Sequence, residues 1–322
     1  MSVAFSIKNR IRRALAQPQV FRWMFKDTVS IVVYHDVSDQ TSAFCNEHAL
    51  NVTPAQFTEQ MKFLQDHFHI IGPDELMSGN FSTPAVMVTF DDGMAGYFHR
   101  AVPIMEKLKI PSLLFLNMGA IQGKLFWSGL VTYLTAYDPQ FAKYIEAKNG
   151  GHIKLPAFLL CGPKTVADYI EKYGSPDLEA RVRTFYGEFG TTRDLQEAAQ
   201  NPFVFYGNHL YNHYNAARLS DDELKEEYRE NQEWINQYSC GRRLFAYPYG
   251  QPGSCFTPQN TKVLLESGAN AIFFSGGGTN LINTEKKLFD RVGVDPAVKT
   301  INDLITRLQA GSLRAGLRKL KP

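Results

Sequence analysis

Two adjacent carboxylates stand at the end of an apolar run, in the segment Thr89-Phe90-Asp91-Asp92-Gly93. Neighbouring like charges repel, and the pKa of one group rises unless a metal ion or a basic group compensates the charge. Further along the chain, His209 and His213 place two imidazoles four residues apart. These residue types suit a divalent metal held by one Asp and two His, with the second Asp free to transfer protons.

Each of these groups also has a simpler interpretation. An Asp-Asp-Gly turn after a strand often caps the next helix, and a His-x-x-x-His pair is often two surface histidines. The groups nevertheless follow four different predicted strands: one leads into His35, one into Asp91, one into His209 and one into Tyr247-Pro248-Tyr249-Gly250. In a barrel of parallel strands, active sites lie at the carboxyl ends of the strands. The joint placement therefore favours a single chemical site.

Short apolar runs alternate with helical patterns, which predicts an α/β fold with parallel strands. Capping boxes at Thr53 and Ser220 mark the starts of two helices. The interval from about 126 to 200 is longer than one βα repeat needs, and we interpret it as a mostly helical insertion, either a substrate-binding lid or scaffold. The predicted strands are Thr28–Tyr34, Ala85–Phe90, Ser112–Asn117, Phe203–Gly207, Arg243–Tyr247, Asn270–Ser275 and Leu288–Val294.

The composition is that of a globular protein. The chain has 322 residues, of which 44% are hydrophobic and 13% aromatic, so it can bury a substantial core. The net charge of +2 is nearly balanced, and we expect no nucleic-acid partner. We expect three segments: a basic N-terminal segment (1–27), a barrel (28–298) that carries the insertion, and a C-terminal helix with a basic tail (299–322).

Basic residues crowd both ends of the chain. They suit either a helix on an anionic membrane surface or two solvated termini. No secretory signal is predicted, because charges interrupt the apolar core that it needs, and no run approaches the roughly 18 apolar residues of a membrane span. The four cysteines form no Cys-x-x-Cys pair, which indicates reduced thiols. We expect a cytoplasmic protein. The basic termini also allow peripheral contact with a membrane surface. The basic residues are Lys8, Arg10, Arg12, Arg13, Arg22, Lys26, Arg314, Arg318, Lys319 and Lys321.

The ligand set narrows the choice of metal. Two imidazoles and one carboxylate suit zinc with an open position for water, and also non-haem iron(II). Leu210 occupies the place of the catalytic Glu of a His-Glu-x-x-His peptidase, which disfavours that class. The iron triad normally sits on an all-β scaffold, whereas this chain alternates β and α. We expect a divalent metal as the cofactor, with Zn2+ as the first choice.

Three motifs carry a resemblance to a known family. The Thr89–Gly93 segment, the pair His209-x-x-x-His213 and the segment Tyr247-Pro248-Tyr249-Gly250 resemble the first three motifs of the polysaccharide deacetylases, the NodB-homology domain of carbohydrate esterase family 4. The resemblance extends from about Val29 to Val294, apart from the insertion. It implies a distorted (β/α) barrel of about seven strands and metal-dependent removal of N- or O-acyl groups from sugars.

The resemblance also implies roles for individual residues. By position, the metal ligands would be Asp92, His209 and His213, and Asp91 would be the general base. The backbone N–H of Tyr249 would donate to the oxyanion.

Two departures from the family pattern matter. Many members have an Arg that orients the catalytic Asp at the position of Ala246, and we expect Arg291, in a late strand, to substitute for it. Members also commonly have a C-terminal His as general acid, yet no histidine follows His213. A permuted branch that makes or modifies extracellular polysaccharides places this His in the first strand, so we assign the general acid to His35.

The expected function is that of a metal-dependent hydrolase. It would remove an N-acyl group, above all N-acetyl, from an amino sugar in a surface-glycan or polysaccharide pathway. The expected partner is an amino-sugar glycan or a lipid- or nucleotide-linked sugar. Two alternatives stay open: a carbohydrate-binding module that has lost catalysis, suggested by the missing Arg, and a non-haem iron oxygenase.

Overall fold

The computed structural model describes residues 24–149, 156–281 and 287–319. The side chains of the basic terminal residues lie outside this described part, apart from that of Lys26. The expected membrane contact through the termini therefore stays a prediction. Among the described helices, none combines the length and the apolar character that crossing a bilayer requires.

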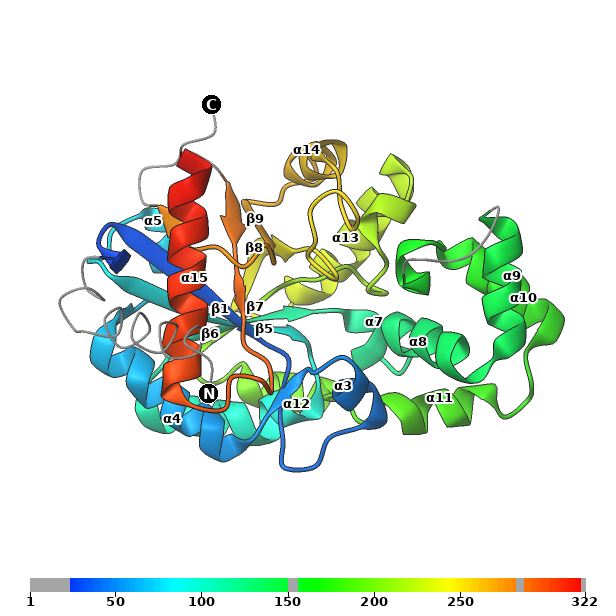
Figure 1. The fold of residues 1–322 in the computed structure, drawn as a ribbon, viewed down its shortest axis with the longest axis horizontal. Helices are drawn as coiled ribbons and strands as arrows, with labels where there is room; N and C mark the ends of the chain where they lie inside the picture. The colour runs from blue at the N-terminus through cyan, green and yellow to red at the C-terminus, as the bar shows by residue number, and fades with distance from the viewer. Residues whose placement is uncertain (1–23, 150–155, 282–286, 320–322) are drawn as a thin grey trace, which may run out of the picture.

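One mainly parallel sheet curls into a nearly closed barrel (Figure 1). Its strands follow the order β10-β1-β5-β6-β7-β8-β9-β11, and only β10 runs antiparallel to its neighbour β1. The strands are β1 (Thr28–Tyr34), β5 (Ala85–Asp92), β6 (Ser112–Leu116), β7 (Val204–Asn208), β8 (Gly241–Ala246), β9 (Ala271–Phe274), β10 (Asn280–Leu281) and β11 (Leu288–Asp290). A short β4 (His69–Ile70) pairs with β5, while β2 (Asp36–Val37) and β3 (Asn51–Val52) pair separately.

The barrel closes through a segment that changes partner at Arg291. Before this residue, β11 pairs with β9; after it, β12 (Val292–Gly293) pairs with β1 at the other edge of the sheet. The N–H of Arg291 itself donates to the carbonyl of Phe274. The sequence predicts one continuous strand here, and the structure divides it because the segment must pair first with one edge and then with the other. The predicted distorted (β/α)7 barrel is confirmed.

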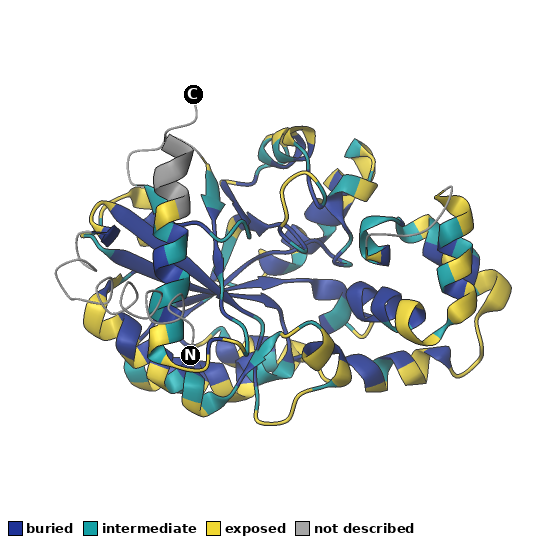
Figure 2. Cartoon of the chain, viewed as in Figure 1, coloured by how far each residue is buried: buried dark blue, intermediate teal, exposed yellow. Residues whose placement is uncertain are grey.

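Alternate residues of each strand face two different cores. Ile31 of β1 and Met87 of β5 share one apolar cluster inside the barrel with Phe115. Their neighbours Val32 and Val88 belong to the cluster beneath the outer helices. Figure 2 shows the central strands β1, β5 and β6 buried along their length, and the adjacent carboxylates Asp91 and Asp92 lie at the end of β5.

Helices follow the strands and cover the outside of the barrel (Figure 1). The predicted capping boxes are present: the hydroxyls of Thr53 and Ser220 accept from the backbone N–H groups of Gln56 and Glu223. The helices are α3 (Ala43–Glu47), α4 (Pro54–His67), α5 (Pro73–Ser78), the π-helix η1 (Tyr97–Ala101), α6 (Val102–Leu108), α7 (Met118–Ile121), η3 (Ala216–Arg218), α13 (Asp221–Ile235), α14 (Pro258–Glu266) and α15 (Ile301–Lys319).

A mostly helical insertion lies between β6 and β7, as predicted, and extends to one side of the barrel (Figure 1). It has its own apolar cluster, in which Phe141, Tyr169 and Val182 are buried. The helix nearest to β7 in the sequence packs instead, through Leu195, on the cluster beneath the outer helices of the barrel. The elements are α8 (Trp127–Tyr137), α9 (Pro139–Lys148), η2 (Ala157–Leu159), α10 (Pro163–Tyr173), α11 (Leu178–Tyr186) and α12 (Thr192–Ala198).

Candidate metal centre

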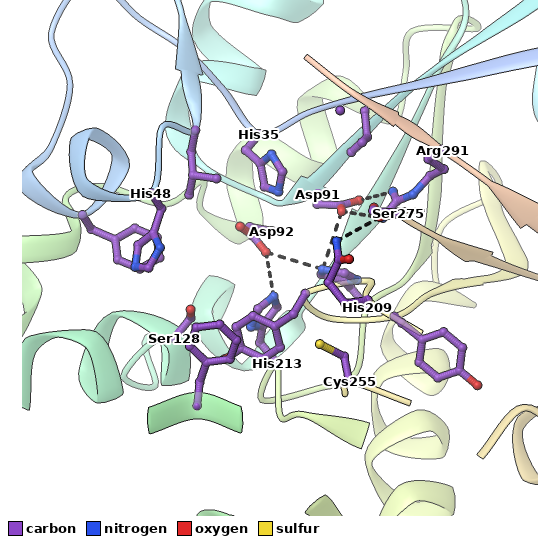
Figure 3. A pocket seen from close by; sticks show the side chains of 18 of the residues that line it. His35, His48, Asp91, Asp92, Ser128, His209, His213, Cys255, Ser275 and Arg291 are labelled. Atoms are coloured by element: carbon purple, nitrogen blue, oxygen red, sulfur yellow. Dashed lines mark hydrogen bonds and ion pairs between the residues drawn. The ribbon is translucent and has the colours of Figure 1, made fainter. Parts of the chain in front are cut away.

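The two adjacent carboxylates face the same cavity because the end of β5 leaves the extended conformation. Asp91 continues the set of inward-facing residues that includes Met87. Asp92 would point outward by the same alternation, but its φ of 73° turns the chain. Both side chains are buried and line the cavity (Figure 3).

A similar turn brings the two histidines together after β7. His209 still follows the ladder, since its N–H donates to the carbonyl of Leu116. Leu210 and His213 then have φ values of 60° and 61°, and the two imidazole centroids lie 4.8 Å apart. Non-glycine residues with positive φ are uncommon, and they cluster at functional sites because a surrounding structure must hold them there. The turn after β8 has the same feature at Tyr249, with a φ of 62°.

Asp92, His209 and His213 converge as a metal ligand set. One ligand atom from each lies within 4.8 Å of the other two. The Nε2 atoms of His213 and His209 lie 3.1 and 3.6 Å from Oδ1 of Asp92, and this buried oxygen has no hydrogen-bond partner in the described part of the chain. Nδ1 of His209 contacts the carbonyl of Ala246 at 2.8 Å, so Nδ1 carries the proton and Nε2 is free to ligate. The residues therefore fit a divalent cation.

The electrostatics also suit ligation. Burial lowers the pKa of His209 to about 4, which keeps the imidazole neutral near pH 7. Burial by itself would raise the pKa of Asp92, but His213, together with His35 and His209, outweighs it and holds the pKa below the usual range. A neutral imidazole and an ionised carboxylate are the forms that bind metals.

Asp91 is held by Arg291 in a two-point ion pair. The guanidinium Nη1 and Nη2 atoms lie 2.6 and 2.8 Å from Oδ1 and Oδ2. Burial favours a higher pKa for Asp91, but the Arg291 charge and His209 overcome this and lower it. Ala246 stands where the family pattern has the Arg that orients the catalytic Asp. In the structure the guanidinium of Arg291, in the closing segment, contacts Asp91 instead.

The remaining predicted site residues surround this centre. His35 follows β1 and lies above the two aspartates in the view of Figure 3. The ring of Tyr249 packs edge-on against His213, with centroids 4.9 Å apart. No hydrogen bond from the Tyr249 N–H is present within residues 24–149, 156–281 and 287–319. Every predicted site residue lines one cavity of about 310 Å3.

Several residues of the cavity wall were not predicted from the sequence, and three of them are of interest here. Ser128 of α8 and Phe158 of η2 come from the insertion, and the Phe158 ring stacks on Tyr249 with centroids 4.2 Å apart. His48 comes from the segment after α3. No local motif marks these residues, and the aromatic richness of the insertion was the only signal for Phe158. The insertion forms part of the pocket wall.

Several solved structures share the fold of this chain. A deacetylase PplD from Streptococcus pyogenes matches with a TM-score of 0.56 and 15% identity, over 87% of this chain and 98% of its own. IcaB from Ammonifex degensii matches with a TM-score of 0.57 and 18% identity, over 89% and 97%. A de-N-acetylase from Aggregatibacter actinomycetemcomitans matches with a TM-score of 0.56 and 17% identity, over 88% and 100%. The chain therefore shares its fold with these proteins.

The sequence itself shows the family. The polysaccharide deacetylase profile matches residues 78–254, which is more than half of the chain. The protein therefore belongs to the polysaccharide deacetylase family, and it is a carbohydrate deacetylase. No curated protein sequence matches it significantly.

Proposed function

We propose that this deacetylase is a metal-dependent hydrolase that removes an N-acetyl group from an amino sugar of a surface glycan or its lipid- or nucleotide-linked precursor. The convergence of Asp92, His209 and His213 beside the ion-paired Asp91 carries the proposal. These three residues would hold the cation, for which zinc is our choice because two imidazoles, one carboxylate and open positions suit it.

The cation would supply Lewis acidity and lower the pKa of water. Asp91, kept ionised by Arg291, accepts the proton of the attacking water as general base. The Tyr249 N–H donates to the oxyanion of the tetrahedral intermediate, and loss of one such donor typically costs on the order of 3 kcal/mol of transition-state stabilisation.

His35 completes the reaction as general acid. An amide nitrogen cannot leave as an anion, so a proton must reach it while the C–N bond breaks. His35 lines the same cavity as the two aspartates and is half-buried, which gives it access to both substrate and solvent. The products are acetate and the free amino sugar.

Names of solved relatives support the choice of an N-acetyl substrate. One structural neighbour is described as a de-N-acetylase, and another was solved in complex with acetate. Acetate is a product of both amide and ester hydrolysis, and the description as a de-N-acetylase leads us to favour the amide.

The test combines metal analysis with acetate release. Purified protein is analysed by mass spectrometry for metals and then assayed on chitin oligomers, poly-N-acetylglucosamine, peptidoglycan, UDP-N-acetylglucosamine and undecaprenyl-linked N-acetylglucosamine. We expect one zinc per chain and acetate release from at least one amino sugar. Release that persists undiminished after chelator treatment, in protein shown to be metal-free, would refute the metal dependence.

A further inference from the structure

His48 is a half-buried histidine that lines the pocket. The proposed mechanism gives it neither a catalytic nor a metal-binding role. Its Nε2 contacts Oγ1 of Thr132 in α8 at 3.0 Å, and its ring packs on Phe44 with centroids 4.7 Å apart. The next residue, Ala49, has a φ of 53°, so the chain turns sharply just after His48. In the view of Figure 3, His48 and Arg291 lie on opposite sides of Asp92. The imidazole is thus held in place across the pocket from the general base.

Only one nitrogen of this ring is engaged by the protein. Within the described residues, Nδ1 of His48 has no hydrogen-bond partner, while Thr132, itself buried, occupies Nε2. Burial lowers the pKa of His48, so the ring is neutral at pH 7. A neutral imidazole has one donor and one acceptor nitrogen. Whichever role Nε2 takes toward the Thr132 hydroxyl, Nδ1 takes the other.

A hydroxyl group is the ligand that matches either tautomer, because it can donate to Nδ1 or accept from it. The acetyl group has no hydroxyl, so such a ligand must come from the sugar ring. The cavity of about 310 Å3 is at the lower end of the roughly 300–1,000 Å3 of small-molecule sites, which leaves room for a sugar ring and few further groups.

We propose that His48, positioned by Thr132 of the insertion, binds a hydroxyl of the sugar ring and so selects for hydroxylated amides. This inference rests on the proposed function. It gives the insertion a part in substrate binding, because α8 supplies the group that fixes the imidazole.

Two probes separate sugar recognition from chemistry. Methyl 2-acetamido-2-deoxy-β-glucopyranoside carries the ring hydroxyls, and N-cyclohexylacetamide is its counterpart without them. Zinc-loaded full-length protein is assayed for acetate release from both. In His48→Phe, which keeps a ring on Phe44 but removes both nitrogens, we expect KM for the glycoside to rise about tenfold. The kcat/KM for N-cyclohexylacetamide should change by less than about twofold.

Further variants test the geometry. Thr132→Val, which keeps the volume but removes the hydroxyl, should also raise KM for the glycoside alone. His48→Gln should restore most of the affinity, since its amide can donate and accept. The exposed His67 provides the control, and His67→Ala should leave both probes unaffected. Titration of the glycoside into the inactive Asp91→Asn protein measures the same affinity without turnover, and it should show the same loss with His48→Phe.

The outcomes are distinguishable. Equal losses on both probes, or an unchanged KM for the glycoside in His48→Phe, would overturn the sugar-binding role while the deacetylase chemistry stands. If wild-type protein releases acetate from neither probe and the glycoside does not bind, the proposed function fails for this sugar class, and the role of His48 fails with it.

Discussion

Arg291 and Asp91 form a buried two-point ion pair although 200 residues separate them in the sequence. Arg291 stands where the closing segment changes its pairing from β9 to β1, so the closure of the barrel and the orientation of Asp91, our proposed general base, depend on the same residue. At the position of Ala246, only the backbone carbonyl takes part, and it fixes the His209 ring. The guanidinium that contacts Asp91 therefore comes from the closing segment and not from the end of β8.

Replacing Arg291 should disturb both stability and the pH profile. Arg291→Gln leaves the Asp91 carboxylate buried without its counter-charge, which typically costs about 3–5 kcal/mol of unfolding free energy. Because Arg291 lowers the pKa of Asp91, its loss raises that pKa. The base is then protonated at higher pH, and the acidic limb of the kcat/KM profile should move to higher pH. Denaturant unfolding and the pH profile measure the two effects.

Two further variants check the cause. Arg291→Lys should restore little activity, since one ammonium cannot make the two parallel bonds of the guanidinium. The double variant with Asp91→Asn should be more stable than Arg291→Gln alone, because the unpaired charge of Asp91 is then also removed. An acidic limb that stays in place in Arg291→Gln would contradict the role of Asp91 as the base that Arg291 tunes.

The adjacent aspartates should have different functions, Asp91 as the general base and Asp92 as a metal ligand. Asp91→Asn keeps the shape of the side chain but cannot accept a proton, so kcat should fall by roughly 10²–10⁴-fold while bound zinc stays near the wild-type level. His213→Ala removes a ligand and should lose both zinc and activity. Metal analysis and acetate release on the same samples make the comparison. Loss of zinc in Asp91→Asn, or full activity in it, would show that the assignment of base and ligand is wrong.

Local signals account for the parts of the fold that could be predicted. The first strand begins and ends at the predicted residues Thr28 and Tyr34, because its apolar run has clear borders. The carboxylate pair and the histidine pair were found from residue type and spacing, and the barrel brings them to one cavity. Strands such as β10, with two residues, are too short to show a period and were not predicted.

Tertiary contacts account for the rest. His48 lies in the pocket wall and contacts Thr132, which is 84 residues away in the sequence. No sequence pattern around either residue indicates this contact. The division of the closing strand at Arg291 follows from the geometry of the closed sheet and not from its residues. Positive φ values at Asp92 and His213 are also invisible in sequence, because neither position is a glycine.

Metal removal should lower the stability of the whole protein. In the absence of a cation, Oδ1 of Asp92 is buried with no hydrogen-bond partner in the described part of the chain, next to two imidazole nitrogens. Zinc at about 100 times its Kd should add about 2.7 kcal/mol by mass action. Thermal unfolding with chelator and with zinc should therefore differ by several degrees. His67→Ala should keep this difference and His213→Ala should lose it; a zinc shift that survives in His213→Ala would place the metal elsewhere.

Asn231 should be among the most sensitive positions outside the pocket. This buried residue of α13 donates to the carbonyl of Leu116 and to Oδ1 of Asn208, and it accepts from the N–H of Met118. Its side chain thereby joins the ends of β6 and β7. The histidine turn, residues 209–213, follows directly after β7. Asn231→Ala leaves the N–H of Met118 without this partner, at about 1–3 kcal/mol, and removes the two hydrogen bonds to Leu116 and Asn208, so we expect a loss of about 2–4 kcal/mol in urea unfolding.

The same variant should also weaken zinc binding, because Oδ1 of Asn208 accepts from the N–H of Leu210 at the start of the histidine turn. Gln237→Ala, at an exposed position just after α13, is the matched control and should change stability by less than about 0.5 kcal/mol. Zinc affinity measured by competition with a chelator distinguishes two cases. A destabilised variant with wild-type affinity would mean that Asn231 supports the fold alone, whereas a parallel loss means that the network from α13 holds the metal ligands in position.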